Sequence, residues 1–307
     1  MGKIAFVFSG QGSQYPGMGK TIREASEVAK AVFRVSEDKR PGTTAQCFEG
    51  TKEELALTVN TQPCLYTVDL AIAEAVKESG IVPDAVAGFS LGEVAALTFS
   101  GVMSREEGFE LVIQRGRLMN DAAQANPGAM AAVMRLTPEQ VTDLAGEFDV
   151  WPVNYNSPLQ TVVAGTENRM PDFLAAVKAQ KGMAVPLKVS GAFHSPCMAP
   201  ASEGLKEALK SVTYDRGWCP VYANATAKPY PQDPKEAKEL TALQVKSPVQ
   251  WQKTIETMVE EGFTTFIEVG AGKTLTGLIQ KIAPQVTAIH IENAEDLEKE
   301  ELHELRK

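Results

Sequence analysis

Short apolar runs alternate with longer amphipathic stretches in the first hundred residues. An apolar run at residues 4–8 predicts a buried strand that leads into a glycine-rich loop. Helical periodicity covers residues 21–35 and 65–76, and a second short apolar strand is predicted at residues 83–90. Strands that alternate with helices are typical of an α/β fold with a largely parallel sheet.

The pattern changes between residues 129 and 189. The predicted elements there are a strand, a helix, two strands, a helix and a strand, at residues 129–134, 137–148, 150–156, 160–165, 170–180 and 183–189. This βαββαβ order is typical of a ferredoxin-like unit. We therefore predict a ferredoxin-like subdomain at residues 128–189, inserted into a discontinuous α/β core formed by residues 1–127 and 190–307.

The α/β pattern returns after this unit. Helices are predicted at residues 200–210 and 249–261, and strands at residues 220–224 and 264–269. The turn GAGKTLTG follows the last of these strands and is similar to the end of a phosphate-binding P-loop. The first glycine of that motif would fall on Ile267, so a nucleotide site is not expected.

The composition excludes several classes of protein. With 307 residues, 44% of them hydrophobic and 22% charged, the chain is long enough to bury a large core. A formal net charge of −9 argues against nucleic acid as the main partner. The four cysteines are far apart and form no Cys-x-x-Cys pair, so neither a disulfide framework nor a metal site is expected. No secretory leader or membrane-spanning segment is recognisable, which predicts a cytoplasmic protein without a membrane partner.

Residues 88–92, Gly-Phe-Ser-Leu-Gly, fit the Gly-x-Ser-x-Gly pattern of a nucleophile elbow. The motif follows a predicted strand and opens a predicted helix, and its small residues let the backbone turn tightly enough to expose the hydroxyl of Ser90. Free N–H groups at the start of the helix would favour negative charge that develops there. The alternative is a glycine-bounded turn in which Ser90 only caps the helix. Ser90 is the candidate nucleophile, although the motif alone does not exclude the capping role.

A nucleophilic serine needs a base, and the sequence contains three histidines. His303 lies in a charged terminal helix and is expected at the surface. His290 lies in an apolar strand and is expected to be a core or edge residue. His194 lies in a loop after a predicted strand, where catalytic groups commonly gather. His194 is therefore the candidate base.

Several segments resemble those of the malonyl-CoA:acyl carrier protein transacylases, in the same order and over nearly the whole chain. They are FSGQGSQYPGMG, GFSLGE, QRGRLM, GAMAAVM, VNYNSPLQTVVAG, GAFHSP, SPVQW and EVGAGKTLTGL. The resemblance implies an α/β-hydrolase-like core with an inserted ferredoxin-like subdomain. It also implies transfer of the malonyl group from malonyl-CoA to the phosphopantetheine thiol of an acyl carrier protein, without a cofactor or a metal, for fatty-acid or polyketide synthesis.

The resemblance further implies roles for five catalytic residues. Ser90 would attack the thioester to form a malonyl-serine ester, and His194 would take the serine proton and return it to the departing thiol. The carrier thiol would then attack this ester, which gives ping-pong kinetics. The backbone N–H groups of Gln11 and Leu91 would form the oxyanion hole. The main-chain carbonyl of Gln244 would orient the histidine, so that no aspartate is needed.

Three more residues would bind the substrate. A planar guanidinium suits the free carboxylate of malonyl better than an ammonium group does. Arg115 and Arg117 lie two residues apart on a predicted helix, so only one of them can face the pocket. The family pattern Arg-Gly-x-x-Met assigns the carboxylate clamp to Arg115 and the pocket wall to Met119. Phe193 would crowd the α-carbon of the substrate and exclude methylmalonyl, or it would simply be a core residue.

One position departs from the family, and two other functions share the elbow. The residue before the nucleophile is usually His and is Phe89 here, which leaves open how the malonyl end is held. Asn154 and Asn156 match a family pair near the pocket but are equally compatible with a turn before Pro158.

The alternative functions are a serine thioesterase or hydrolase, which releases the acid to water, and a catalytically silent module that binds a carrier protein.

Overall fold

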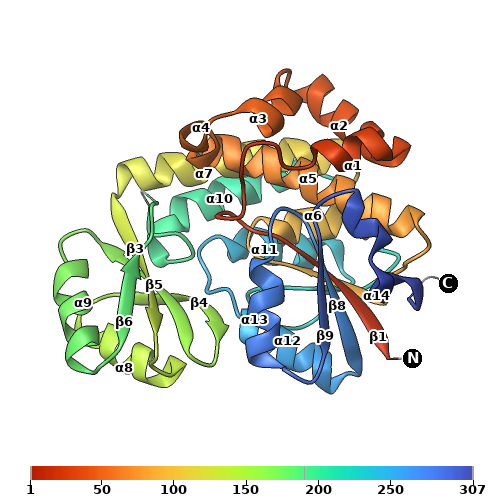
Figure 1. Cartoon of the computed structure of the whole chain (residues 1–307). Coiled ribbons are helices and arrows are strands. Elements are labelled where there is room, and N and C mark those ends of the chain that lie inside the picture. The colour runs from red at the N-terminus through yellow and green to blue at the C-terminus, as the bar shows by residue number, and fades with distance from the viewer. Residues whose placement is uncertain (1, 190, 306–307) are drawn as a thin grey trace.

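The computed structural model describes residues 2–189 and 191–305. A five-stranded sheet in the order β7-β2-β1-β8-β9 forms the centre of the larger part of the molecule (Figure 1). Its neighbouring strands are all parallel, which confirms the predicted parallel sheet. The strands are β1 (Lys3–Phe8), β2 (Ala85–Gly88), β7 (Val221–Tyr222), β8 (Phe263–Val269) and β9 (Thr287–Ile291).

Helices cover both faces of this sheet (Figure 1). The helices of the larger part are α1 (Lys20–Ala25), α2 (Glu27–Lys39), α3 (Thr43–Glu49), α4 (Lys52–Ala56), α5 (Thr58–Glu78), α6 (Gly92–Phe99), α7 (Arg105–Ala125), α10 (Ala199–Ala208), α11 (Pro234–Gln244), α12 (Trp251–Glu260), α13 (Thr274–Ile282) and α14 (Glu300–His303), with 3-10 turns at Pro196–Met198, Leu209–Ser211 and Glu295–Glu298. In β1, Phe6 and Phe8 pack with residues of α5, α6 and α7, whereas Val7 packs with residues of α12 and α13. Burial on both faces explains why the parallel strands are near-continuous apolar runs.

A second, antiparallel sheet lies beside the first, at the lower left of Figure 1. Its strands follow the order β4-β5-β3-β6. The chain runs through β3 (Gly128–Met134), α8 (Pro138–Glu147), β4 (Trp151–Ser157), β5 (Gln160–Thr166), α9 (Met170–Ala179) and β6 (Met183–Pro186). This βαββαβ succession confirms the predicted ferredoxin-like unit. The predicted domain boundaries themselves stay a prediction, and Ser190, next to one of them, lies outside the described residues.

The two faces of the small sheet have different partners. In β3, Ala131 and Val133 pack with α8 and α9, whereas Met130 and Ala132 belong to the same apolar core as α5 and α7. The alternation of side chains along a strand therefore joins the small sheet to the larger part through one face only.

Main-chain hydrogen bonds reinforce this joint. The N–H of Tyr155 in β4 donates to the carbonyl oxygen of Val249 at 2.9 Å, and the N–H of Val249 donates to the carbonyl oxygen of Val153 at 2.8 Å. Val249 lies two residues before the start of α12, so β4 is fixed to the segment that leads into this helix. The side chains of β4 that face the joint are consequently held against the larger part.

Two of the predicted helices have the wrong extent. Residues 21–35 form parts of two helices that break at Ser26, because the hydroxyl of Ser26 accepts the N–H of Ala29 at 3.2 Å and starts α2. The helix predicted to begin at residue 65 begins at Thr58 and includes Pro63. Proline normally disfavours a helix interior, and burial of most of α5 in the core outweighs this preference here.

Candidate active site

The elbow after β2 has the tight geometry that the glycine pattern predicts. Ser90 has a φ of 54°, in the left-handed region that non-glycine residues rarely adopt. A Cβ atom on Gly88 would lie 2.0 Å from the backbone of Gly92, and one on Gly92 would lie 2.4 Å from the carbonyl oxygen of Phe8. Both flanking positions therefore require glycine, and Ser90 stands at the bend between β2 and α6.

The loop after the small sheet places His194 against Ser90. The Oγ atom of Ser90 lies 2.7 Å from Nε2 of His194. The Nδ1 atom of the same ring lies 3.0 Å from the carbonyl oxygen of Gln244, at the end of α11. An acceptor at Nδ1 holds the proton there and leaves Nε2 free to accept the serine proton. His194, Ser90 and Gln244 are thus in the geometry of a serine–histidine pair with a main-chain carbonyl as the orienting group.

Helix α7 brings Arg115 to the same point. Its Nη2 atom lies 3.1 Å from the Oγ atom of Ser90 and 2.9 Å from Oε1 of Gln244. The Arg115 side chain is 2% exposed, whereas Arg117, two residues further along the helix, is exposed. Only Arg115 therefore faces the site, as their spacing on a helix predicts.

Two backbone N–H groups beside Ser90 are free to bind an anion. Among the described residues, no hydrogen bond uses the N–H of Leu91 or that of Gln11. The N–H of Ser90 itself donates to Oδ1 of Asn224 at 2.7 Å, so it is not available. The free N–H groups belong to the two residues that the resemblance suggests for an oxyanion hole.

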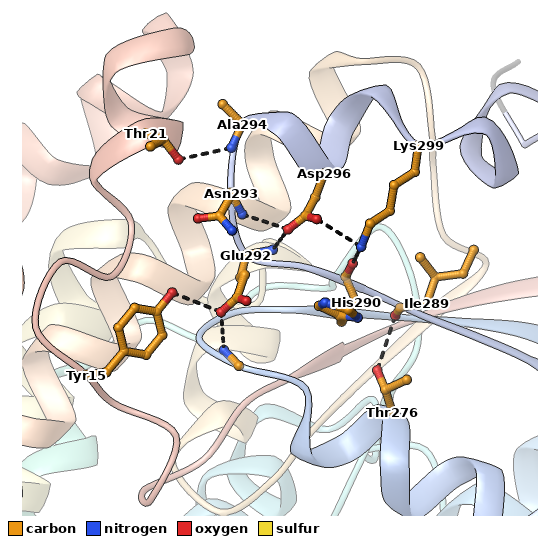
Figure 2. A network of polar contacts seen from close by, with 11 residues as sticks. Tyr15, Thr21, Thr276, Ile289, His290, Glu292, Asn293, Ala294, Asp296 and Lys299 are labelled. Atoms are coloured by element: carbon orange, nitrogen blue, oxygen red, sulfur yellow. Dashed lines mark hydrogen bonds and ion pairs between the residues drawn. The ribbon is translucent and has the colours of Figure 1, made fainter.

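The loop that carries Gln11 is fixed at several points, some of which appear in Figure 2. The hydroxyl of Tyr15 donates to the carboxylate of Glu292 at 2.9 Å, and the N–H of Gly272 donates to the same carboxylate at 2.9 Å. At the other end of the loop, the hydroxyl of Ser9 donates to the buried carboxylate of Asp69 at 2.9 Å. The segment after β9 and the turn after β8 thus hold the glycine-rich loop in place.

A cavity opens beside the Ser90 hydroxyl, and most of its lining is apolar. Its lining residues are Gln11, Phe89, Ser90, Met119, Met130, Asn154, Leu187, Val189, Phe193 and His194. Met119 and Phe193 are both among the lining residues, and their roles in substrate binding stay predictions. Phe89 packs edge-on against the ring of Trp251, with ring centroids 5.5 Å apart. Phenylalanine at this position turns one wall of the cavity apolar.

The asparagine pair lies in a strand and not in a turn. Asn154 and Asn156 are both buried residues of β4, so the interpretation as turn formers is wrong. The Oδ1 atoms of both side chains are buried and have no hydrogen-bond partner among the described residues. Asn154 also lines the cavity, so its amide is a polar group available to a ligand there.

Burial shifts the ionisation of three groups in the site. Desolvation, and then the charge of Arg115, lowers the pKa of His194 to about 4, so the imidazole is neutral at pH 7. Desolvation lowers the pKa of Arg115 to about 10, which leaves the guanidinium charged. Desolvation raises the pKa of the Glu93 carboxyl, in the first turn of α6, to about 7. A neutral base beside a charged guanidinium is the state in which His194 can accept the serine proton.

The low pKa of His194 predicts an acid limb far below the usual range of histidine. The neutral imidazole is the form that can accept a proton, so loading of Ser90 by a serine-directed acylating reagent should be constant from about pH 7 to about pH 5 and fall as the pH approaches about 4. The unfolded histidine titrates near 6.5, so the unfolded state binds more protons and stability is also lost as the pH falls from about 6.5 to about 4.

Single-turnover loading at each pH, with the folded fraction measured by circular dichroism, separates these two effects. A loading rate that halves near pH 6.5 while the protein stays folded would contradict the account of His194.

None of the other histidines and none of the cysteines lines this cavity. His290 is in β9, where its carbonyl oxygen accepts a hydrogen bond from Nζ of Lys299 at 2.6 Å (Figure 2). His303 is exposed. All four cysteines are free thiols. The described residues contain no cluster of His, Cys, Asp and Glu side chains suited to a metal ion. Within the same residues, no helix combines the length and the apolar character needed to cross a bilayer.

Sequence analysis missed two residues that touch the elbow. Asn224, after β7, bonds to the backbone of the motif, and Glu93 accepts the N–H of Asn224. The only signal for Glu93 is its place in GFSLGE, where an acidic residue in the first turn of a helix is ordinary. No signal distinguishes Asn224, because an asparagine after a strand is a common turn residue.

Nearly the whole chain is similar to known proteins. Residues 5–302 match the acyl transferase domain family. The chain is 40% identical over 306 residues to the malonyl CoA-acyl carrier protein transacylase of Bacillus subtilis (strain 168), with 97% of this chain and 96% of the relative covered. A crystal structure of the corresponding protein from Clostridium perfringens ATCC 13124 is similar, with a TM-score of 0.94, 36% identity, and coverage of 99% of this chain and 97% of that one.

One further solved structure shows a relative with its partner. It is described as a type II PKS acyl-carrier protein in complex with its malonyl-transacylase. The similarity has a TM-score of 0.92 at 33% identity and covers 96% of this chain and 97% of that one.

Proposed function

Since the chain belongs to the acyl transferase domain family and is a malonyl-CoA:acyl carrier protein S-malonyltransferase, we propose that it transfers the malonyl group through an ester on Ser90. The observation that carries this proposal is the contact of Ser90 Oγ with both His194 Nε2, at 2.7 Å, and Arg115 Nη2, at 3.1 Å. A nucleophile, a base and a carboxylate receptor meet at one atom, which is what malonyl transfer requires.

In the loading step, Ser90 Oγ attacks the thioester carbonyl of malonyl-CoA. Nε2 of His194 takes the hydroxyl proton as the C–O bond forms, and it gives this proton to the sulfur as the C–S bond breaks. The products are a malonyl-serine ester and free coenzyme A. In the second step, the phosphopantetheine thiol of the carrier gives its proton to His194 and attacks the ester carbonyl. The C–S bond forms, the ester C–O bond breaks, and His194 returns the proton to Ser90 Oγ, so that the products are malonyl-carrier and free Ser90. The kinetics are therefore ping-pong, with malonyl-CoA and the carrier as the two substrates.

The two free N–H groups stabilise the tetrahedral intermediates of both steps. In each intermediate the carbonyl oxygen becomes negative, and the N–H groups of Gln11 and Leu91 donate to it. Loss of one such donor typically costs about 3 to 4 kcal/mol of transition-state stabilisation. The multiple contacts of the Gln11 loop, through Tyr15 and Ser9, support this role because a fixed donor needs no reorganisation during the reaction.

The guanidinium of Arg115 binds the free carboxylate of malonyl. Within the described residues, the side chain of Arg115 donates two hydrogen bonds, both from Nη2. They go to Oγ of Ser90 and to Oε1 of Gln244. A carboxylate that enters the cavity replaces these neutral acceptors with a charge-assisted pair. Malonyl is thereby held with its thioester carbonyl beside Ser90, and acyl groups without a carboxylate lack this interaction.

Phe193 supplies discrimination against a branched substrate. Its ring lines the cavity, and the residue is only 6% exposed. A methyl group on the α-carbon of the substrate would therefore clash with this ring. Replacing Phe193 by Ser should raise the kcat/KM ratio of methylmalonyl-CoA to malonyl-CoA about 10- to 100-fold, since about 1 to 3 kcal/mol is the usual value of one methyl group. A purely structural role predicts a lower melting temperature with an unchanged ratio.

The test of the function is the fate of the malonyl group with and without carrier. The enzyme is incubated with malonyl-CoA, holo carrier protein is added to one half, and free malonate and malonyl-carrier are quantified by mass spectrometry. Transfer predicts a loaded carrier and little free malonate. Free malonate with an unloaded carrier would indicate a thioesterase, and unchanged malonyl-CoA in both halves would indicate a silent binding module.

A further inference from the structure

Side-chain amides hold the backbone of the nucleophile elbow on both sides of Ser90. Asn224 Oδ1 accepts the N–H of Ser90 at 2.7 Å, and Asn224 Nδ2 donates to the carbonyl oxygen of Gly88 at 2.6 Å. Gln244 Nε2 donates to the carbonyl oxygen of Ser90, also at 2.6 Å. These contacts join the elbow to the segment after β7 and to the end of α11, both more than a hundred residues away in the chain.

Asn224 is itself held by a buried carboxylate. Its N–H donates to Oε2 of Glu93 at 2.5 Å, and the hydroxyl of Tyr230 donates to Oε1 of Glu93 at 2.5 Å. The carbonyl oxygen of Asn224 accepts the N–H of Gln250 at 2.9 Å. Asn224 is fully buried and Glu93 is 2% exposed, so neither side chain can exchange these partners for water.

Ser90 has a strained backbone conformation, which these contacts stabilise. A serine with a φ of 54° is not held in that conformation by its own sterics and persists only where the surroundings over-determine it. The bonds from Asn224 fix the two peptide groups that precede Ser90, on either side of Phe89, and the bond from Gln244 fixes the one that follows it. Without them, the Oγ atom is free to move from its position 2.7 Å from His194 Nε2.

We propose that Asn224 and Glu93 are positioning residues of the transfer reaction, with Glu93 fixing Asn224 and Asn224 fixing the strained backbone of Ser90. This inference rests on the proposed role of Ser90 as the nucleophile. Neither residue lines the cavity, so neither touches the acyl group directly. Asn224 acts through the elbow and through Nε2 of Gln244, which lies 3.4 Å from its Oδ1 atom, and Glu93 acts through Asn224 and through its charge interaction with Arg115. Arg115, Met119 and Phe193, which bind the acyl group, are left in place when Asn224 is changed.

The decisive variant is Asn224→Ala. Loss of its two side-chain bonds to the elbow should lower kcat about 10- to 100-fold, with the KM for malonyl-CoA within about threefold of wild type because the binding residues are untouched. The second readout is the rate at which a fluorophosphonate, a small serine-directed reagent, labels Ser90. This rate needs neither malonyl nor a carrier and should fall in proportion to kcat.

Variants of Glu93 separate positioning from bulk packing. Glu93→Gln keeps an oxygen that accepts the N–H of Asn224 and an amide that donates to the Tyr230 oxygen, so most of kcat should remain. Glu93→Ala removes the acceptor and should reproduce the loss seen in Asn224→Ala. The matched control is Asn60→Ala, because Asn60 also bonds through both amide atoms, to the carbonyl oxygen of Glu54 and to Arg40, each at 2.9 Å.

The kinetic and labelling results of these variants either support or overturn the proposal. A parallel fall in kcat and labelling rate with an unchanged KM, rescued in Glu93→Gln and absent in Asn60→Ala, supports the proposal. An unchanged kcat, or a loss that disappears when rates are corrected for the folded fraction, overturns it. If wild-type enzyme is labelled but never loads malonyl, the proposed function fails, and slow labelling of Asn224→Ala then still supports the positioning role.

Discussion

Replacing Ser90 by Ala should abolish formation of the acyl-enzyme and lower malonylation of the carrier by at least about 10⁴-fold, as for other enzymes that lose the nucleophile of a catalytic serine–histidine pair. The effect is this large because no other hydroxyl replaces the one that contacts His194 Nε2 at 2.7 Å. Binding of malonyl-CoA should change little, because Arg115 keeps its bond to Gln244 Oε1. The measurement is carrier malonylation over time with the loaded and unloaded carrier separated by mass.

Ser100→Ala is the matched control for this variant. Ser100 follows the last turn of the same helix, α6, is fully buried, and donates its hydroxyl proton to the carbonyl oxygen of Leu97 at 2.9 Å. Its loss removes a buried serine bond without touching the site, so activity should stay within about twofold of wild type. Malonylation by Ser90→Ala at a comparable rate would show that the nucleophile is a different residue.

Replacing Arg115 by Ala should change the acyl selectivity of the enzyme. The variant should lose about 10²- to 10³-fold in malonyl loading, since removing one partner of a buried charge pair costs about 2 to 5 kcal/mol. Acetyl loading should be spared or raised, because acetyl has no carboxylate to leave unpaired and the buried charge near Ser90 is gone. The measurement is the kcat/KM ratio for malonyl-CoA and acetyl-CoA in single-turnover loading.

Arg117→Ala tests whether this effect belongs to the buried arginine alone. Arg117 lies on the same helix but is exposed, so both substrates should be loaded at wild-type rates. Arg115→Lys should recover only part of the malonyl rate, because an ammonium group cannot form the planar two-bond contact with a carboxylate. Equal losses for malonyl and acetyl in Arg115→Ala would mean that Arg115 supports the site but does not bind the carboxylate.

The architecture was largely predictable because its strands have simple environments. The central strand β1 is covered on both faces, so all of its residues after Lys3 are apolar, and β2 ends in a motif that is typical of a strand-to-helix bend. The ferredoxin-like unit was predictable because its two helices are amphipathic and its strands are short and separated by clear turns. The short helices α3 and α4 and the longer helix α11 were not predicted, since polar residues fill much of each and their packing decides the structure.

The site was predictable only where a residue type is rare or its chemistry is distinctive. Three histidines made the choice of His194 tractable, and helical spacing showed that one of two arginines must face away. The contacts of Asn224 and Glu93 were not predictable, because both residue types are common in the positions they occupy along the chain. Their importance depends on burial and on partners more than a hundred residues away, which tertiary packing alone determines.

The most direct test of the central claim is the mass of the enzyme itself after brief exposure to malonyl-CoA without carrier, followed by acid quenching and peptide mapping. The account predicts one malonyl ester per chain, on the peptide that contains Ser90, and its disappearance when holo carrier protein is added before the quench. A malonyl group on another residue, or carrier malonylation without any detectable ester on Ser90, would contradict the account.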